Sequence, residues 1–158
     1  MNRTDFNTAK SYLTHPAKIA VISSKCENKT NLITLEWFMR TSINPAMFAI
    51  SIGKTRFSHK CLEENRYFNI CFPAKEMKNF AIISGKYSGK DTDKLTLSNE
   101  NYFAGRYRKL PIFSNAVANF ECETITQIRS GDHIIYVGKV IYSWLNPEKK
   151  LLLYSDMI

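Results

Sequence analysis

Short runs of β-branched and aromatic residues, separated by Gly, Asn and Pro, recur along the chain. Such runs are typical of strands, and the separating residues are typical of turns. The predicted strands cover residues 19–23, 32–39, 47–52, 67–72, 116–128 and 133–144. The last two flank Arg129–Asp132, whose Ser-Gly-Asp sequence suits a tight hairpin turn.

Two stretches have helical character instead. Residues 58–65 have helical composition, with Ser58 as the predicted N-cap. Residues 74–84 place their apolar side chains at helical spacing, which predicts a short amphipathic helix. Residues 86–107 predict a long loop. Because the strands do not alternate with helices, we expect one mainly β domain over residues 1–158, a barrel or a sandwich.

The charge balance changes the picture of possible partners. The chain carries 22 basic and 14 acidic side chains, a formal net charge of +8. Such an excess favours an anionic partner: nucleic acid, acidic lipid or a phosphorylated small molecule. No apolar run approaches the roughly 20 residues of a membrane helix. Residues 1–18 are too polar for a signal peptide, so we expect a cytoplasmic location and no membrane partner.

Cysteine and histidine usage gives little support for a metal or a nucleophile. The four cysteines are Cys26, Cys61, Cys71 and Cys122. Their spacing is not that of a zinc site, so we expect reduced thiols and no bound metal. On a helix, Cys61 and His59 would point apart, so a Cys–His nucleophile is not predicted. If the chain is an enzyme, the difficult chemistry belongs to a bound cofactor.

Three clusters could carry chemistry, and two of them could bind an anion. Ser84–Lys94 combines two Ser-Gly steps with three lysines, which suits either an anion-binding loop or a solvated surface loop. Lys54–His59 joins Arg56 and Ser58 to a helix N-terminus, which suits a phosphate site or a simple capped helix. Asn31–Trp37 predicts a strand with a polar row, and Trp37 at its end is predicted to be a core side chain.

The order of these motifs resembles the flavin reductase-like, FMN-binding split-barrel family, which includes the flavoredoxins. The matching segments run nearly from end to end: His15–Ser23, Asn31–Trp37, Asn44–Ile52, Arg56–Ser58, Phe68–Ile70, Ser84–Leu95, Leu110–Ile112, Glu121–Cys122 and Gly131–Gly138. Several positions depart from the family pattern, among them two of the candidate site residues. Ser58 stands where Thr is usual, which keeps a hydroxyl, and Ser84 stands where Cys is frequent.

The resemblance implies a six-stranded antiparallel Greek-key split barrel with a few short helices. It also implies a homodimer with FMN at the subunit interface, and no nucleic acid. By the same resemblance, Arg56 and Ser58 would hold the FMN phosphate, while Asn31, Ile33 and Thr34 would line the flavin and ribityl chain. The residues that would close over the flavin or its phosphate are Ser84, Gly85, Ser88, Gly89 and Lys94.

Trp37 and His133 would lie near the isoalloxazine ring, and His133 is the candidate catalytic residue. A structural role for His133 at the hairpin is the alternative. The implied activity is either NAD(P)H:flavin oxidoreduction or flavoredoxin-like electron transfer, with NAD(P)H or a redox protein as electron donor. Two other functions stay open: a non-catalytic FMN-binding or sensory module, and a basic barrel that binds single-stranded nucleic acid.

Overall fold

The computed structural model describes residues 3–11 and 17–158, so His15 and Pro16 of the first predicted motif lie outside the described residues. The strands are β1 (Ala20–Cys26), β2 (Lys29–Leu35), β3 (Phe38–Ser42), β4 (Met47–Gly53), β5 (Tyr67–Phe72), β6 (Tyr102–Ala104), β7 (Pro111–Phe113), β8 (Ala118–Ser130) and β9 (His133–Leu145). The α-helices are α1 (Phe6–Ser11), α2 (Phe57–Glu64), α3 (Lys78–Lys86) and α4 (Lys94–Ser98). Two short 3₁₀ helices cover Lys75–Met77 and Tyr154–Asp156.

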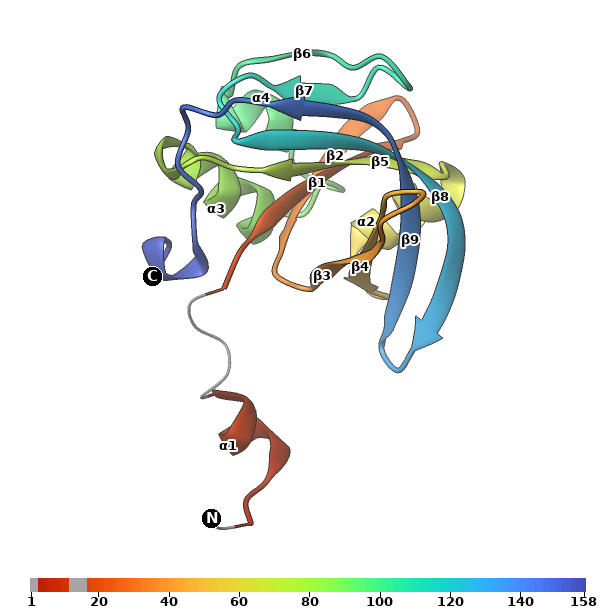
Figure 1. Ribbon diagram of the computed structural model, residues 1–158, viewed down its shortest axis with the longest axis vertical. Coiled ribbons are helices and arrows are strands. Elements are labelled where there is room, and N and C mark those ends of the chain that lie inside the picture. The colour runs from red at the N-terminus through yellow and green to blue at the C-terminus, as the bar shows by residue number, and fades with distance from the viewer. Residues whose placement is uncertain (1–2, 12–16) are drawn as a thin grey trace.

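Seven strands form one antiparallel sheet in the order β2-β1-β5-β8-β9-β4-β3, and β6 pairs with β7 separately. Figure 1 shows how strongly the long strands β8 and β9 curve. Both edge strands come from one stretch of chain, because only Glu36 and Trp37 separate β2 from β3. The sequence predicts a single strand there, so the six predicted strands correspond to the seven of this sheet, and β6 and β7 have no counterpart among them.

The core lies on both faces of β1, whose first three residues, Ala20–Ile22, are apolar. Val21 packs with the apolar face of α3, together with Phe80. Ala20 and Ile22 point to the other face, into a second cluster with Ile50 and other side chains of β4, β5 and β9. Successive residues of a strand face opposite sides, so Val21 enters one cluster while Ala20 and Ile22 enter the other.

The predicted helix over residues 74–84 is present as the 3₁₀ turn followed by α3. The prediction of a long loop over 86–107 is wrong in part, because this segment holds α4 and β6. Asp93 caps α4 by accepting a hydrogen bond from the Thr96 N–H at 3.1 Å. α4 has five residues and β6 has three, which is too short for a hydrophobic period to show.

Among the described residues, no helix is both long and apolar enough to span a membrane.

Candidate functional site

A cavity of about 450 Å³ opens where β2 and β4 end, α2 begins and the segment after α3 turns back. Every predicted site residue except Asn31 and Lys94 lines it: Ile33, Thr34, Trp37, Arg56, Ser58, Ser84, Gly85, Ser88, Gly89 and His133. Segments that are far apart in the sequence therefore meet in one place. The volume is in the usual range for small-molecule sites, roughly 300–1,000 Å³.

The first wall of this cavity, which we name the α2 wall, consists of Thr55–Ser58, with Asn31 of β2 bonded behind it. Ser58 is buried in the first turn of α2, and its hydroxyl accepts a hydrogen bond from the Asn31 side-chain amide at 2.8 Å. The prediction of Ser58 as the N-cap is wrong, because Arg56 occupies that position and the helix begins at Phe57. Within the described ranges the Ser58 hydroxyl donates to no other group, so its proton can bond to a ligand.

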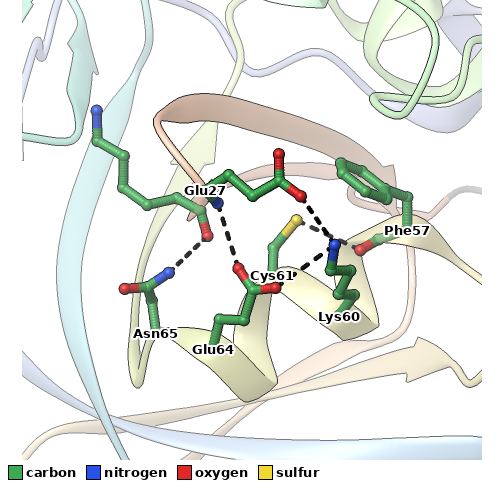
Figure 2. A network of polar contacts seen from close by, with 7 residues as sticks. Glu27, Phe57, Lys60, Cys61, Glu64 and Asn65 are labelled. Carbon is green, nitrogen blue, oxygen red and sulfur yellow. Dashed lines mark hydrogen bonds and ion pairs between the residues drawn. The ribbon is translucent and has the colours of Figure 1, made fainter.

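The far end of α2 is tied to the turn between β1 and β2, as Figure 2 shows. Lys60 donates to Glu27 Oε1 at 3.0 Å and lies 3.6 Å from Glu64 Oε1. Glu64 accepts from the Glu27 N–H, and the Asn65 side chain donates to the Lys25 carbonyl at 3.1 Å. These contacts, with the packing of α2 on β1, fix the direction in which the helix presents its N-terminus.

The opposite wall, which we name the α3 wall, is Ser84–Gly89, and Lys94 holds it from behind. The Lys94 ammonium donates to the Ser84 carbonyl at 2.9 Å and to the Tyr87 carbonyl at 3.1 Å. Burial lowers the pKa of Lys94 from 10.5 to about 8, and the nearby charge of Arg56 acts in the same direction. Lys94 thus fixes the wall at the C-terminal end of α3, where a cation is favourable.

Two glycines allow the α3 wall to approach β2 closely. A Cβ on Gly89 would lie 1.9 Å from Asn31 Oδ1, and one on Gly85 would lie 3.3 Å from Thr34 Cβ. Thr34 also donates to the Ala81 carbonyl at 2.6 Å, which joins β2 to α3. Asn31 therefore stands behind the cavity lining and in contact with both walls.

Two buried polar atoms beside the cavity lack a partner. Within residues 3–11 and 17–158, neither Ser84 Oγ nor Asn31 Oδ1 has a hydrogen-bond partner. An unpaired buried polar group costs about 1–3 kcal/mol. Such groups at a cavity wall are therefore candidates for bonding to a ligand.

The mouth of the cavity carries Trp37 and His133. Trp37 is 54% exposed, so the prediction of a core tryptophan is wrong. It stands between β2 and β3, where the chain passes from one edge of the sheet to the other. Its ring lies 4.7 Å from that of His133, centroid to centroid. His133 Nδ1 lies 2.6 Å from Asp132 Oδ1, and this contact lowers the pKa of Asp132.

Sequence reasoning missed several lining residues, among them Leu35, Glu36, Ser51, Ile52, Gly53, Thr55, Phe57, Lys86 and Tyr87. Thr55, Lys86 and Tyr87 lie inside the clusters already singled out and could have been included. Ser51–Gly53 reach the cavity because β4 ends there, and only the sheet topology brings that end beside β2.

The four cysteines are free thiols, as the sequence predicts, and all four are buried. Burial raises the pKa of the Cys61, Cys71 and Cys122 thiols. Cys61 donates to the Phe57 carbonyl at 3.3 Å, whereas His59 contacts Tyr136, so the two do not form a Cys–His pair. Neutral buried thiols are poor nucleophiles.

Comparison with known proteins gives a consistent result. The flavin reductase like domain family matches residues 12–157. The crystal structure of an FMN-binding protein from Thermus thermophilus superposes with a TM-score of 0.82 at 27% identity, covering 98% of this chain and 87% of that one.

Two relatives with named activities come from Streptomyces. An NADH-dependent FMN reductase of Streptomyces nodosus subsp. asukaensis is 24% identical, over 87% of this chain and 72% of its own. An NADH-dependent FAD reductase of Streptomyces globisporus is 25% identical, over 78% of this chain and 67% of its own. Relatives at similar identity therefore use different flavins.

Proposed function

The chain belongs to the flavin reductase-like family, and on that premise we propose that it binds FMN in the 450 Å³ cavity and acts as an NAD(P)H-dependent flavin oxidoreductase. A flavoredoxin-like electron carrier is the other form of the same proposal. The observation that carries it is the convergence of Arg56, the buried Ser58 hydroxyl and a helix N-terminus on one wall, opposite the Ser84 hydroxyl, which has no partner in the described part of the chain.

The α2 wall suits the FMN phosphate. Arg56 supplies a cation, Ser58 an O–H donor, and the first turn of α2 supplies backbone N–H groups that have no partner within the helix. A phosphate dianion gains from charge-assisted bonds to such groups. Asn31 positions the Ser58 hydroxyl, which is a positioning role behind the lining.

The α3 wall and the mouth suit the flavin ring and its ribityl chain. Ile33 and Thr34 form the floor, and the backbone of Gly85 and Gly89 allows close approach. When bound, FMN supplies the capacity to accept a hydride or electrons. Trp37 and His133 present ring surfaces at the mouth, where they would orient a planar ligand.

Lys94 enters the proposal in a changed role. Its ammonium binds the Ser84 and Tyr87 carbonyls behind the wall and does not line the cavity. We therefore assign it the positioning of Ser84, in place of direct contact with the flavin. The cations that line the cavity are Arg56 and Lys86.

A homodimer is part of the proposal, and exposed apolar side chains beside the cavity support it. Trp37 and Met39 are 54% and 61% exposed, and they line an apolar hollow of about 260 Å³ with Ile135. Clustered exposed apolar residues are typical of association surfaces. Light scattering should give twice the monomer mass for the wild type, and Met39→Glu should shift the measured mass toward that of the monomer.

The decisive test compares FMN with riboflavin. We expect Arg56→Ala to weaken FMN binding about tenfold or more, because a charged hydrogen bond is worth roughly 1.5–3 kcal/mol. Riboflavin lacks the phosphate, so its affinity should not change. Equal effects on both ligands would remove Arg56 from the phosphate subsite.

Turnover separates an oxidoreductase from a binding module. FMN-loaded protein should consume NADH or NADPH with added FMN as acceptor. Bound flavin that neither nucleotide nor a redox protein reduces would contradict the oxidoreductase and leave a non-catalytic FMN-binding module. Protein that takes up no FMN would overturn the whole proposal.

A further inference from the structure

A second cavity, of about 510 Å³, lies between α2 and the end of the β8–β9 hairpin. Its lining is Lys54, His59, Glu63, Gln127, Arg129 and Ile134, and none of these lines the first cavity. We propose that this second cavity binds the phosphate-bearing ribose of an adenine nucleotide. The inference rests on the proposed function, since it assigns a place to the half of a dinucleotide that carries no redox chemistry.

The two cavities share one wall. In the segment from Gly53 to His59, Gly53 and Thr55–Ser58 line the first cavity, whereas Lys54 and His59 line the second. The segment joins the end of β4 directly to the first turn of α2. A nucleotide group in the second cavity would therefore lie directly behind the wall to which we assign the FMN phosphate.

Two cations make the second cavity suitable for phosphate. The Lys54 ammonium donates to the Gly131 carbonyl at 2.6 Å, which fixes it against the hairpin turn and leaves two of its protons. Arg129 is exposed, and in the part of the chain that the structure describes it has no carboxylate within ion-pair distance. A guanidinium without an internal partner can bind phosphate in a bidentate manner.

The remaining polar groups suit hydroxyls. Tyr136 is fully buried, and its hydroxyl donates to Glu63 Oε1 at 2.7 Å. A phenol has one proton, so His59 Nδ1, at 2.6 Å from the same oxygen, must be the donor in that contact. The contact with Tyr136 uses Nδ1, so Nε2 of His59 can bond to a ligand. With the Gln127 amide, the cavity offers donors and acceptors for ribose hydroxyls beside its two cations.

The direct test is a calorimetric titration of FMN-saturated protein with AMP. A parallel titration uses adenosine, which lacks the phosphate. Arg129→Glu should weaken AMP binding about tenfold or more, as loss of a charged hydrogen bond predicts. Lys139→Glu is the matched control, because it makes the same charge change on an exposed position of β9 outside both cavities. Circular dichroism checks that both variants fold.

The nucleotide source is settled by two further comparisons with the same variants. If the adenylate belongs to FAD, Arg129→Glu should weaken FAD binding to FMN-free protein and leave FMN binding unchanged. If it belongs to a pyridine nucleotide, the same change should raise the KM for that nucleotide several-fold with little change in kcat.

AMP binding that is absent, or that Arg129→Glu and Lys139→Glu weaken equally, would overturn the inference. The two proposals fail separately. A chain that takes up no FMN but binds AMP through Arg129 would overturn the proposed function and support the second cavity. A chain that binds and reduces FMN but does not bind AMP would support the proposed function and overturn the inference about the second cavity.

Discussion

The two walls of the first cavity are built by different means. On the α2 wall, Ser58 and Asn31 bond to each other across β2 and α2, and the helix is fixed at its far end by Glu27, Lys60 and Glu64. On the α3 wall, backbone carbonyls depend on the single buried ammonium of Lys94. One wall is held by mutually bonded side chains and the other by one remote charge.

This difference has a consequence for how each wall responds to change. A buried charge is costly to desolvate, so the α3 wall should be sensitive to pH. The α2 wall has a neutral hydrogen bond at its centre and should depend on shape and pairing. We therefore expect substitutions on the α3 wall to change the pH dependence of stability, and substitutions on the α2 wall to change packing and hydrogen bonding.

The largest expected effect is the pH dependence that Lys94 imposes. Burial lowers its pKa from the usual 10.5 to about 8 in the folded chain. Between these values the unfolded state binds more protons, so the free energy of unfolding should rise with pH, by about 3 kcal/mol over the window. Chemical denaturation of flavin-free protein from pH 7.5 to 11 measures this rise.

Lys94→Met provides the control for that rise. The variant lacks the titrating group, so the difference between its stability curve and that of the wild type isolates the lysine from other groups. Parallel curves would show that Lys94 titrates normally and would remove the contrast between the walls.

The next effect concerns the close approach of the α3 wall to β2. Gly89→Ala places a Cβ 1.9 Å from Asn31 Oδ1, so the wall or the asparagine must shift. We expect a loss of about 2 kcal/mol in stability, within the range for overpacking, together with weaker FMN binding. Gly85→Ala is the control on the same wall, because its Cβ would stand 3.3 Å from Thr34. If both variants behave alike, the Asn31–Gly89 contact is not a constraint.

The α2 wall could be predicted from the sequence better than the α3 wall. Arg56 and Ser58 could be assigned because they lie within one short motif at a helix start. The strands could be read from their composition, and β4, β5, β8 and β9 match the predicted runs closely. Local patterns determine these features, so local reasoning finds them.

Other features depend on tertiary contacts that no short pattern reveals. The buried position of Lys94 behind Ser84 comes from the short helix α4, whose five residues show no period. The exposure of Trp37 follows from the break between β2 and β3, which turns one predicted strand into two edges of the sheet. In both cases the sheet or helix packing overrides the preference of the residue.

A smaller effect is expected from Ser58→Ala on the α2 wall. The change removes the acceptor of the buried Asn31 amide, which should cost about 1–2 kcal/mol. It also removes one donor to the phosphate, so FMN affinity should fall while riboflavin affinity stays the same. Ser58→Thr keeps the hydroxyl and should recover most FMN binding. Failure of threonine to do so would mean that the site needs the smaller side chain more than the hydroxyl.

The smallest stability effect is expected for Trp37→Leu. Because the side chain is 54% exposed, the change should alter the free energy of unfolding by less than about 0.5 kcal/mol. Flavin affinity should fall about fivefold, since an aromatic contact is worth roughly 1 kcal/mol. Trp144→Leu is the matched control: Trp144 is half-buried and donates to Glu121 at 2.9 Å, away from the cavity. That variant should lose stability and keep its flavin affinity, and the reverse pattern would return Trp37 to the core role that its sequence position predicts.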